Sequence, residues 1–316
     1  MRIIVIGGTG HIGGHLIPML VRDGAQVVVI TRGRGEVPRC DEWSKVRIEQ
    51  GSYDGGGGEA GANWSAFLKK ILRDGDTLID ILGADLMGTY DIAKSRGVGH
   101  VIACGSVWML GTPRRVPYNE ISQTPFWGEG YATRWKTIQN VLQRGIAGDG
   151  PLFTAILPPN ISGPGKIPLD TQGGRDLAVH RSLMEGTTVL LPEGPDVLIG
   201  PCDAEDVARP FCLAARQPRR AAGEIFNVGS AYALTAEEFV ATYGQIYGVR
   251  IPVRRVPWKQ FAEEVVPDPG ARYHFEAHMC PDITKLRERL GYEPHHTPEQ
   301  SLWRAVSWMR RYGLLG

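Results

Sequence analysis

Four glycines within seven residues are the feature of this sequence that most directly suggests chemistry. The run follows an apolar segment at residues 3–6, precedes a segment with helical periodicity, and reads Gly7-Gly8-Thr9-Gly10-His11-Ile12-Gly13. A backbone that turns from strand to helix while a pyrophosphate approaches its N–H groups has no room for side chains. The sequence therefore predicts a dinucleotide site. The residues expected to form it are Gly7, Thr9, Gly10, His11, Ile12 and Gly13.

Two arginines after the next predicted strand bear on which dinucleotide binds. Residues 31–34 contain Arg32 and Arg34 but no acidic residue to accept hydrogen bonds from an adenosine ribose diol. Guanidinium groups here can pair with a 2′-phosphate, so NADP is the favoured cofactor and NAD stays open. The alternative is that both arginines are solvated surface residues.

Short apolar segments alternate with segments of helical periodicity through the first half of the chain. The expected strands are residues 3–6, 26–30, 77–82 and 100–104, and the expected helices are 11–23, 64–73 and 86–96. Such alternation is typical of a parallel sheet that binds ligands at the carboxyl ends of its strands. The predicted fold class is therefore α/β, a Rossmann-type doubly wound parallel sheet with a smaller C-terminal substrate lobe.

The distribution of proline and glycine indicates where one domain gives way to the next. Both residue types become dense after residue 158, so we expect residues 1–160 to form the dinucleotide-binding domain and 161–316 mainly the substrate-binding lobe. A strand near 224–228 is expected to return to the sheet. Helical periodicity recurs at 235–247, 282–289 and 298–312. Residues 51–63 are rich in glycine and are expected to form a mobile surface loop.

Composition excludes several classes of protein. Hydrophobic residues make up 42% and charged residues 22%, as in soluble globular proteins. The net charge of +1 gives no basic surplus for nucleic acid, and the five scattered cysteines lack the spacing of a metal site. No stretch approaches the roughly 20 apolar residues of a membrane span, and the N-terminal apolar segment is too short for a signal peptide. We expect a cytoplasmic protein without a membrane partner.

Several further segments, in order, match one family. They are Cys104-Gly105-Ser106 leading to Gly111, Tyr131 at the start of a helix, and residues 157–160, 163–165, 203–207, 226–229 and 282–294. With the glycine turn, they make the chain resemble the extended short-chain dehydrogenase/reductase family, of the NAD-dependent epimerase/dehydratase type, along nearly its whole length. The resemblance implies that Ser106 and Tyr131 hold the reacting oxygen and that Tyr131 moves a proton. It also implies a homodimer formed through paired helices.

The resemblance breaks four residues after Tyr131, where Trp135 stands in place of the family's lysine. At 100° per residue, Arg134 lies about 60° round a helix from Tyr131, whereas Lys136 lies about 140° away. Three alternatives follow. Arg134 supplies the cation, or the helix shifts locally to admit Lys136, or the hydride chemistry is weakened or lost.

Other departures concern the substrate. Val107 and Trp108 occupy the places of the Asp-Glu pair of the family's dehydratases, which disfavours sugar 4,6-dehydration. Leu157 and Ile199 stand where sugar-nucleotide enzymes commonly carry arginines, so a free sugar or a glycoside competes with a nucleotide sugar. The candidate substrate residues are Asn160, Trp108 and His180, with loop capping, core packing and a structural histidine as the respective alternatives.

These observations together predict an NAD(P)-dependent epimerase or oxidoreductase that acts on a secondary alcohol or ketone of a sugar or sugar-like substrate. One alternative is a non-redox or weakly active homologue that keeps the dinucleotide as a structural element or sensor. Another is an RNA-binding relative of the same fold, which the near-neutral charge opposes.

Overall fold

The computed structural model describes residues 1–33, 40–51, 59–121, 127–194 and 196–315, and within these residues one parallel sheet dominates the fold. Its strands are β1 (Arg2–Ile6), β2 (Gln26–Thr31), β3 (Arg47–Gln50), β4 (Thr77–Asp80), β5 (His100–Cys104), β6 (Leu152–Leu157) and β11 (Glu224–Asn227). They lie in the order β11-β6-β5-β4-β1-β2-β3. This is the predicted doubly wound Rossmann-type arrangement. The strand order reverses direction between β1 and β4, where such sheets bind ligands.

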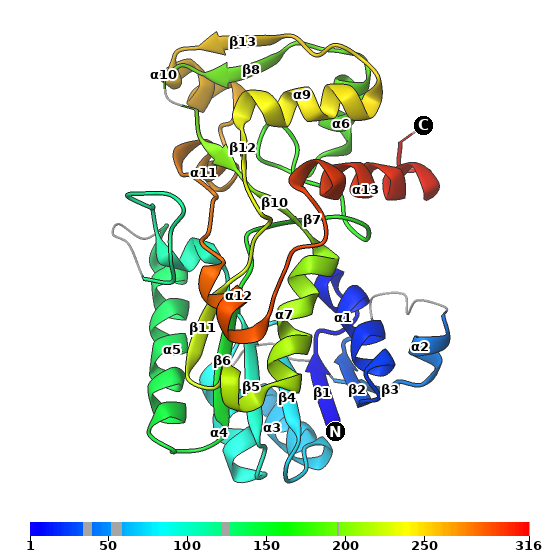
Figure 1. The fold of residues 1–316 in the computed structure, drawn as a ribbon, viewed down its shortest axis with the longest axis vertical. Helices are drawn as coiled ribbons and strands as arrows, with labels where there is room; N and C mark the ends of the chain where they lie inside the picture. The colour runs from blue at the N-terminus through cyan, green and yellow to red at the C-terminus, as the bar shows by residue number, and fades with distance from the viewer. Residues whose placement is uncertain (34–39, 52–58, 122–126, 195, 316) are drawn as a thin grey trace.

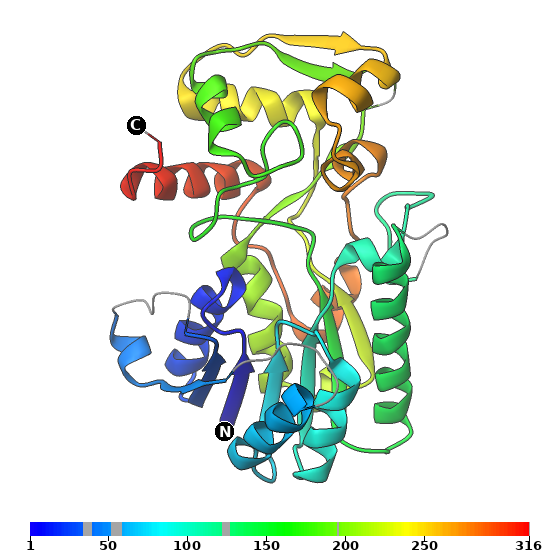
Figure 2. The same cartoon turned by 180° about the vertical axis from the view of Figure 1, so that it is seen from behind.

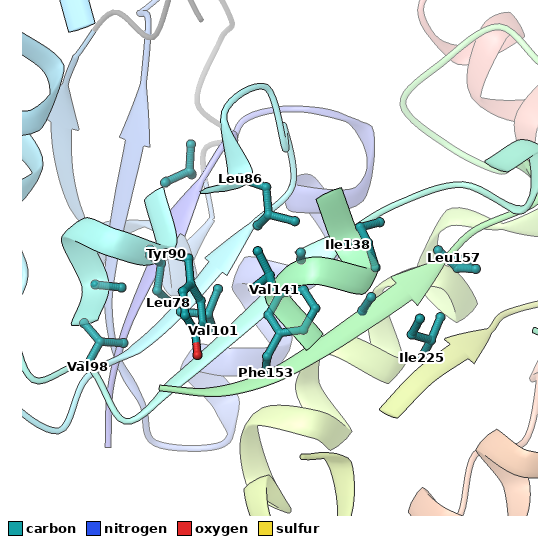
Figure 3. Packing of buried hydrophobic residues seen from close by; sticks show 14 of the residues in the cluster. Leu78, Leu86, Tyr90, Val98, Val101, Ile138, Val141, Phe153, Leu157 and Ile225 are labelled. Atoms are coloured by element: carbon teal, nitrogen blue, oxygen red, sulfur yellow. The ribbon is translucent and has the colours of Figure 1, made fainter. Parts of the chain in front are cut away.

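Helices cover both faces of this sheet (Figure 1). They are α1 (His11–Arg22), α2 (Asp41–Ser44), α3 (Glu59–Ile71), α4 (Leu86–Ser95), η1 (Val107–Leu110), α5 (Glu129–Ile146), α7 (Ala204–Arg216), α8 (Pro218–Ala221) and α12 (Thr284–Leu290). The core under α3, α4 and α5 contains Tyr90, Val101 and Phe153, all without exposed surface (Figure 3). The core on the opposite face joins α1 and α7 to the sheet.

A second, smaller lobe lies beyond the carboxyl ends of the strands (Figures 1 and 2). Its strands are β7 (Asn160–Ser162), β8 (Val189–Pro192), β9 (Leu198–Ile199), β10 (Pro201–Asp203), β12 (Leu234–Thr235) and β13 (Val253–Val256). Its helices are α6 (Leu177–Met184), α9 (Ala236–Tyr247), α10 (Trp258–Gln260), η2 (Phe261–Val265), α11 (Pro269–Glu276) and α13 (Pro298–Arg311). Buried aromatic residues such as Phe239, Tyr243 and Phe261 give the lobe its own core.

The chain crosses between the two lobes several times, whereas a single boundary at residue 160 would require one crossing. β11 pairs in parallel with β6, α7 packs on α1, and α12 packs on α7 and β11, so these later segments belong with the large sheet. The segment between β12 and α11 stays in the small lobe. No helix among the described residues is long and apolar enough to cross a membrane.

Two local features differ from the sequence prediction. The edge strand β3 was not predicted, because its residues are mostly exposed and show no apolar alternation; its backbone pairing with β2 forms the strand. The prediction of a glycine-rich loop at residues 51–63 is wrong at its C-terminal end, since α3 begins at Glu59. Residues 52–58 of that prediction lie outside the described part of the chain.

Candidate active site

The turn from β1 into α1 has no room for a side chain at Gly7 or at Gly13. Gly7 has a φ of +82°, and a Cβ there would lie 2.9 Å from the Cγ atom of Leu82. A Cβ on Gly13 would lie 2.1 Å from the carbonyl oxygen of Gly8, far inside van der Waals contact. Gly10 precedes α1 and gives it no side-chain cap, so the first N–H groups of the helix are available to an anion. These features fit a dinucleotide pyrophosphate.

A cavity of about 280 Å³ continues from this turn along the edge of the sheet. Gly7, Thr9 and Gly10 line one side of it, and the Thr9 hydroxyl is 2.9 Å from that of Thr31. The rest of its described lining is Ile6, Ile30, Thr31, Arg32, Gly51, Trp64 and Leu82. An apolar cavity that adjoins a helix N-terminus suits the adenosine end of a dinucleotide.

Arg32 is exposed at the rim of this cavity, and none of the described lining residues is acidic. The sequence prediction paired Arg32 with Arg34, but Arg34 lies outside the described residues. Of the two arginines, the structure thus places Arg32 at the rim of this cavity.

His11 and Ile12 can contribute to this site mainly through their backbone. Ile12 is 6% exposed and packs in the core, while the Nε2 atom of His11 is 3.1 Å from the carbonyl oxygen of Pro164. The Nε2 atom of His15, one helical turn on, is 2.9 Å from the same oxygen. Burial, followed by His15 and Arg175, lowers the pKa of His11 to about 3. His11 is thus a neutral side chain that ties α1 to the small lobe.

Ser106 follows β5 at the carboxyl end of the sheet. Backbone hydrogen bonds from Gly105 to Ile156 and from Val107 to Pro158 fix the segment against β6. The Ser106 side chain caps η1, where its Oγ atom accepts a hydrogen bond from the Trp108 N–H group at 3.3 Å. Since a hydroxyl has a second lone pair and a proton of its own, Ser106 keeps the capacity to donate to a substrate oxygen.

Tyr131 lies in the first turn of α5, half-buried against the core of the large domain. The helix runs without interruption from Glu129 to Ile146, so no local shift brings Lys136 round to the tyrosine side. Trp135 is 3% exposed and belongs to the core, whereas Lys136 is exposed. At the position of the family's lysine, this chain therefore has a tryptophan that packs in the core.

Arg134 turns toward the loop after β4. Its Nη2 atom donates to the carbonyl oxygen of Leu82 at 3.4 Å and lies near Gly83. The same loop is fastened from within by Asp80, whose Oδ1 atom accepts from the N–H groups of Leu82 at 3.0 Å and Gly83 at 2.9 Å. Burial raises the pKa of Asp80, and the charge of Arg134 opposes that rise.

Sequence reasoning missed Asp80. The signal available was an acidic residue at the end of an otherwise apolar strand, at the carboxyl edge where ligands bind. Because Leu82 also lines the cofactor cavity, Asp80 and Arg134 both support the wall of that cavity.

A cluster of four aromatic rings, which we call the ring cluster, lies beside Ser106. Its members are Trp108 of η1, Trp127 before α5, and Tyr273 and His274 of α11. Trp108 contacts the other three, with ring centroids 5.6 Å from Trp127, 6.4 Å from Tyr273 and 5.2 Å from His274. Trp127 and Tyr273 are 4.2 Å apart. Such distances are those of interacting aromatic pairs.

Asn160 joins this cluster through His274, because its Nδ2 atom lies 3.1 Å from the histidine Nδ1 atom. The structure thus brings together the predicted Asn160 and Trp108. Tyr273 and His274 were not predicted. They come from a helix more than a hundred residues after Asn160, and nothing in the local sequence of α11 indicates where the chain places it.

His180, the third predicted substrate residue, lies instead in the core of the small lobe. It has no exposed surface, its Nδ1 atom is 3.0 Å from the Tyr247 hydroxyl, and its Nε2 atom is 3.3 Å from the Pro168 carbonyl oxygen. Both ring nitrogens therefore have partners inside the protein, which is the environment of a structural histidine.

Asp203, Glu205 and His296 approach one another closely enough to suggest a metal site. Arg304 already pairs with both carboxylates, at 2.9 Å from Asp203 and 2.8 Å from Glu205. The group is therefore an ion-pair network that links α13 to β10 and α7.

Comparison with known proteins agrees with this arrangement. Residues 3–229 match the family described as the NAD dependent epimerase/dehydratase family. UDP-glucose 4-epimerase of Lactobacillus helveticus is 22% identical, over 94% of this chain and 93% of its own. UDP-N-acetyl-alpha-D-glucosaminuronate decarboxylase of Bacillus cytotoxicus is 24% identical, over 98% of both.

A solved structure of MoeE5 in complex with UDP-glucuronic acid and NAD has the same fold, with a TM-score of 0.71 and 19% identity over 99% of this chain and 100% of its own. The family match covers more than half of the chain and includes the glycine turn, Ser106 and Tyr131. The chain belongs to the NAD dependent epimerase/dehydratase family, and it is an NAD-dependent enzyme of the extended short-chain dehydrogenase type.

Proposed function

We propose that this enzyme is an epimerase or oxidoreductase that acts on a secondary alcohol or ketone of a sugar or sugar-like substrate. The observation that carries this proposal is the position of Ser106 and Tyr131, which follow β5 and open α5 at the carboxyl edge of the sheet, the edge that also carries the dinucleotide turn. The two relatives support it, since the names of both refer to UDP-linked sugars.

The residues from Gly7 to Gly13 and the adjoining cavity would hold NAD, which supplies a hydride acceptor or donor when bound. Ser106 would donate a hydrogen bond to the substrate oxygen while its Oγ atom still accepts one from the Trp108 N–H group. Tyr131 would hold the same oxygen and move a proton at its hydroxyl. The work of the protein is then positioning and one proton transfer.

Arg134 would position the loop after β4 and would not replace the family's lysine. Its hydrogen bond to the Leu82 carbonyl draws the guanidinium toward the loop after β4. There, with Asp80, it would keep Leu82 against Gly7 and so shape the wall of the cofactor cavity. Its charge would still contribute to the field at the carboxyl edge of the sheet.

NADP preference and dimerisation are finer proposals. Arg32 at the rim of the adenosine cavity would pair with a 2′-phosphate, so the Kd for NADPH would be lower than that for NADH, and Arg32→Ala would remove the difference. Equal or tighter NADH binding by the unaltered protein would contradict this preference. The homodimer implied by the family resemblance would be checked by light scattering.

The unusual environment of the tyrosine supports a second candidate function. Trp135 is committed to the core and Lys136 is exposed, so Tyr131 lacks the family's usual cation. A protein that binds the dinucleotide as a sensor or structural element needs the glycine turn but not the proton transfer.

One experiment separates these functions. The protein is purified without added nucleotide, and any nucleotide released on denaturation is identified by mass spectrometry. The protein is then given NAD or NADP with a panel of sugars, glycosides and nucleotide sugars, while nicotinamide reduction and epimer formation are followed. Turnover that Tyr131→Phe abolishes supports the enzyme. Tight dinucleotide binding without turnover on any member of the panel supports the sensor.

A further inference from the structure

Residues 163–166, which follow β7, form a turn that lies over the start of α1 (Figures 1 and 2). The Pro164 carbonyl oxygen lies 3.1 Å from the Nε2 atom of His11, the first residue of the helix. A Cβ on Gly165 would lie 3.2 Å from the Cδ2 atom of the same ring. Lys166, which ends this turn, therefore stands beside the helix end that is proposed to hold the dinucleotide pyrophosphate.

Lys166 brings an ammonium group to this place. Its side chain is exposed, and among the described residues it has no hydrogen bond and no ion pair. The pKa of His11 is lowered first by burial and also by the charge of Lys166. Because the effect of a charge falls with distance, the ammonium group lies near the first turn of α1 and can be reached from solvent.

Arg175 adds a second cation to this region. It is half-buried, and its guanidinium donates to the carbonyl oxygens of Ile161 at 2.8 Å and Ile167 at 2.6 Å. After burial, its charge is a further cause of the lowered pKa of both Lys166 and His11. Backbone carbonyls satisfy N–H groups but do not cancel a positive charge, so two cations remain close together here.

The carboxylates nearest to these cations have other partners. Asp170, whose charge acts on Arg175, accepts from three backbone N–H groups of its own loop, at 2.7, 2.9 and 3.0 Å. Asp203, which lies against Gly163, pairs with Arg304 at 2.9 Å. Within the described part of the chain, no carboxylate pairs with either cation, and a bound anion would stabilise both. The uncapped N–H groups at the start of α1 favour an anion at the same place.

We propose that Lys166, supported by the charge of Arg175, is a further dinucleotide-binding residue that pairs with the pyrophosphate at the start of α1. This inference rests on the dinucleotide site of the proposed function. The small lobe then takes part in holding the cofactor, through a charge that comes from outside the glycine turn. A nucleotide sugar carries a diphosphate of the same chemistry, so the test separates the two ligands.

The test measures binding to the full-length protein and needs no turnover. NADH and ADP-ribose are titrated by calorimetry into the unaltered protein and into Lys166→Ala. We expect the substitution to raise the Kd for both ligands about tenfold, because both contain the pyrophosphate. Added NaCl should weaken NADH binding to the unaltered protein more than to Lys166→Ala, since salt screens the lost ion pair. Lys166→Arg, which keeps the charge, should keep most of the affinity.

Lys259→Ala is the matched control. Lys259 is an exposed lysine of α10 in the same lobe, and Figure 1 places α10 at the end of the lobe away from α1. This variant should change neither the Kd for NADH nor its salt dependence. Thermal melting of each variant shows whether it is folded.

UDP-glucose, titrated into the NADH-loaded protein, tests the other source of a diphosphate. A loss of UDP-glucose affinity in Lys166→Ala with unchanged NADH affinity would overturn the inference and assign Lys166 to the substrate. Equal NADH binding by Lys166→Ala and the unaltered protein, or equal losses in Lys166→Ala and Lys259→Ala, would also overturn it. In each of these cases the unaltered protein still binds NADH and the proposed function stands. Failure of the unaltered protein to bind NADH would instead remove the proposed function and the inference with it.

Discussion

The two ends of the proposed site are built in different ways. The cofactor end is made by consecutive residues from Gly7 to Gly13, and what matters there is backbone direction and the absence of side chains. At the proposed substrate end, side chains from separate segments meet, as Trp108 and Asn160 do through His274. We infer that the cofactor end depends on the absence of a side chain at Gly7 and Gly13, whereas the substrate end depends on which side chains meet there.

The largest effect is expected from Gly13→Ala. Its Cβ would lie 2.1 Å from the Gly8 carbonyl oxygen, so the turn must distort, at a cost of about 2 kcal/mol or more in stability, and we expect dinucleotide binding to be lost. Gly14→Ala is the control, because a Cβ there meets nothing within 4 Å. Calorimetric titration with NADH measures both. Normal binding by Gly13→Ala would show that side chains, not backbone, define this end.

Tyr131→Phe should come next in size. Loss of the proton-carrying hydroxyl is expected to lower kcat about 100-fold or more on an identified substrate, with NADH binding unchanged. The measurement is steady-state turnover beside a direct NADH titration. Full turnover by the variant would mean that another group moves the proton.

Arg134 lies between the two ends and should show a moderate effect. If it positions the Leu82 wall, Arg134→Ala should weaken NADH binding about three- to tenfold and leave the pH dependence of kcat unchanged. Arg134→Lys should restore part of the affinity. Lys136→Ala, at an exposed position in the same helix, is the control and should change neither quantity. A shift in the pH profile of kcat in Arg134→Ala would instead assign Arg134 the role of the missing lysine.

The smallest effect is expected from pH. Because burial lowers the pKa of His274 to about 4, substrate binding that depends on Asn160 should stay constant from pH 8 to pH 5 and weaken only below that, when Nδ1 becomes protonated and can no longer accept from Asn160. His274→Gln should remove the acid-side loss. Binding that weakens with a midpoint near pH 6.5 would contradict the neutral, buried state of this ring.

The same lowering affects stability in a defined direction. Unfolded histidine binds its proton near pH 6.5, while folded His274 does so only near pH 4, so the unfolded state binds more protons between these values. The contribution of His274 to stability is therefore complete above pH 6.5 and is lost as the pH falls toward 4. Denaturant titrations of the unaltered protein and His274→Gln at several pH values measure this difference.

The sequence could predict the strand, the glycine turn and the helix of the proposed cofactor end because this geometry is local. A strand, a glycine turn and a helix follow one another along the chain. Ser106 lies just after the end of β5, and Tyr131 lies in the first turn of α5. The same reasoning could not find His274, because helical periodicity in α11 gives no information about which distant segment the helix meets. It also selected His180 for its intrinsic pKa, although the fold buries that ring completely.

Asp80 and β3 show two other physical limits. In the sequence, Asp80 is only a polar residue at the end of an apolar strand. The geometry of the turn is needed to show that its carboxylate accepts hydrogen bonds from two backbone N–H groups. β3 has no apolar pattern because an edge strand with exposed side chains needs only backbone pairing.

The single carbonyl oxygen of Pro164, shared by His11 and His15, has a consequence for motion. It fastens the first turns of the cofactor helix to the small lobe at one point, so the lobes cannot separate there without breaking two hydrogen bonds.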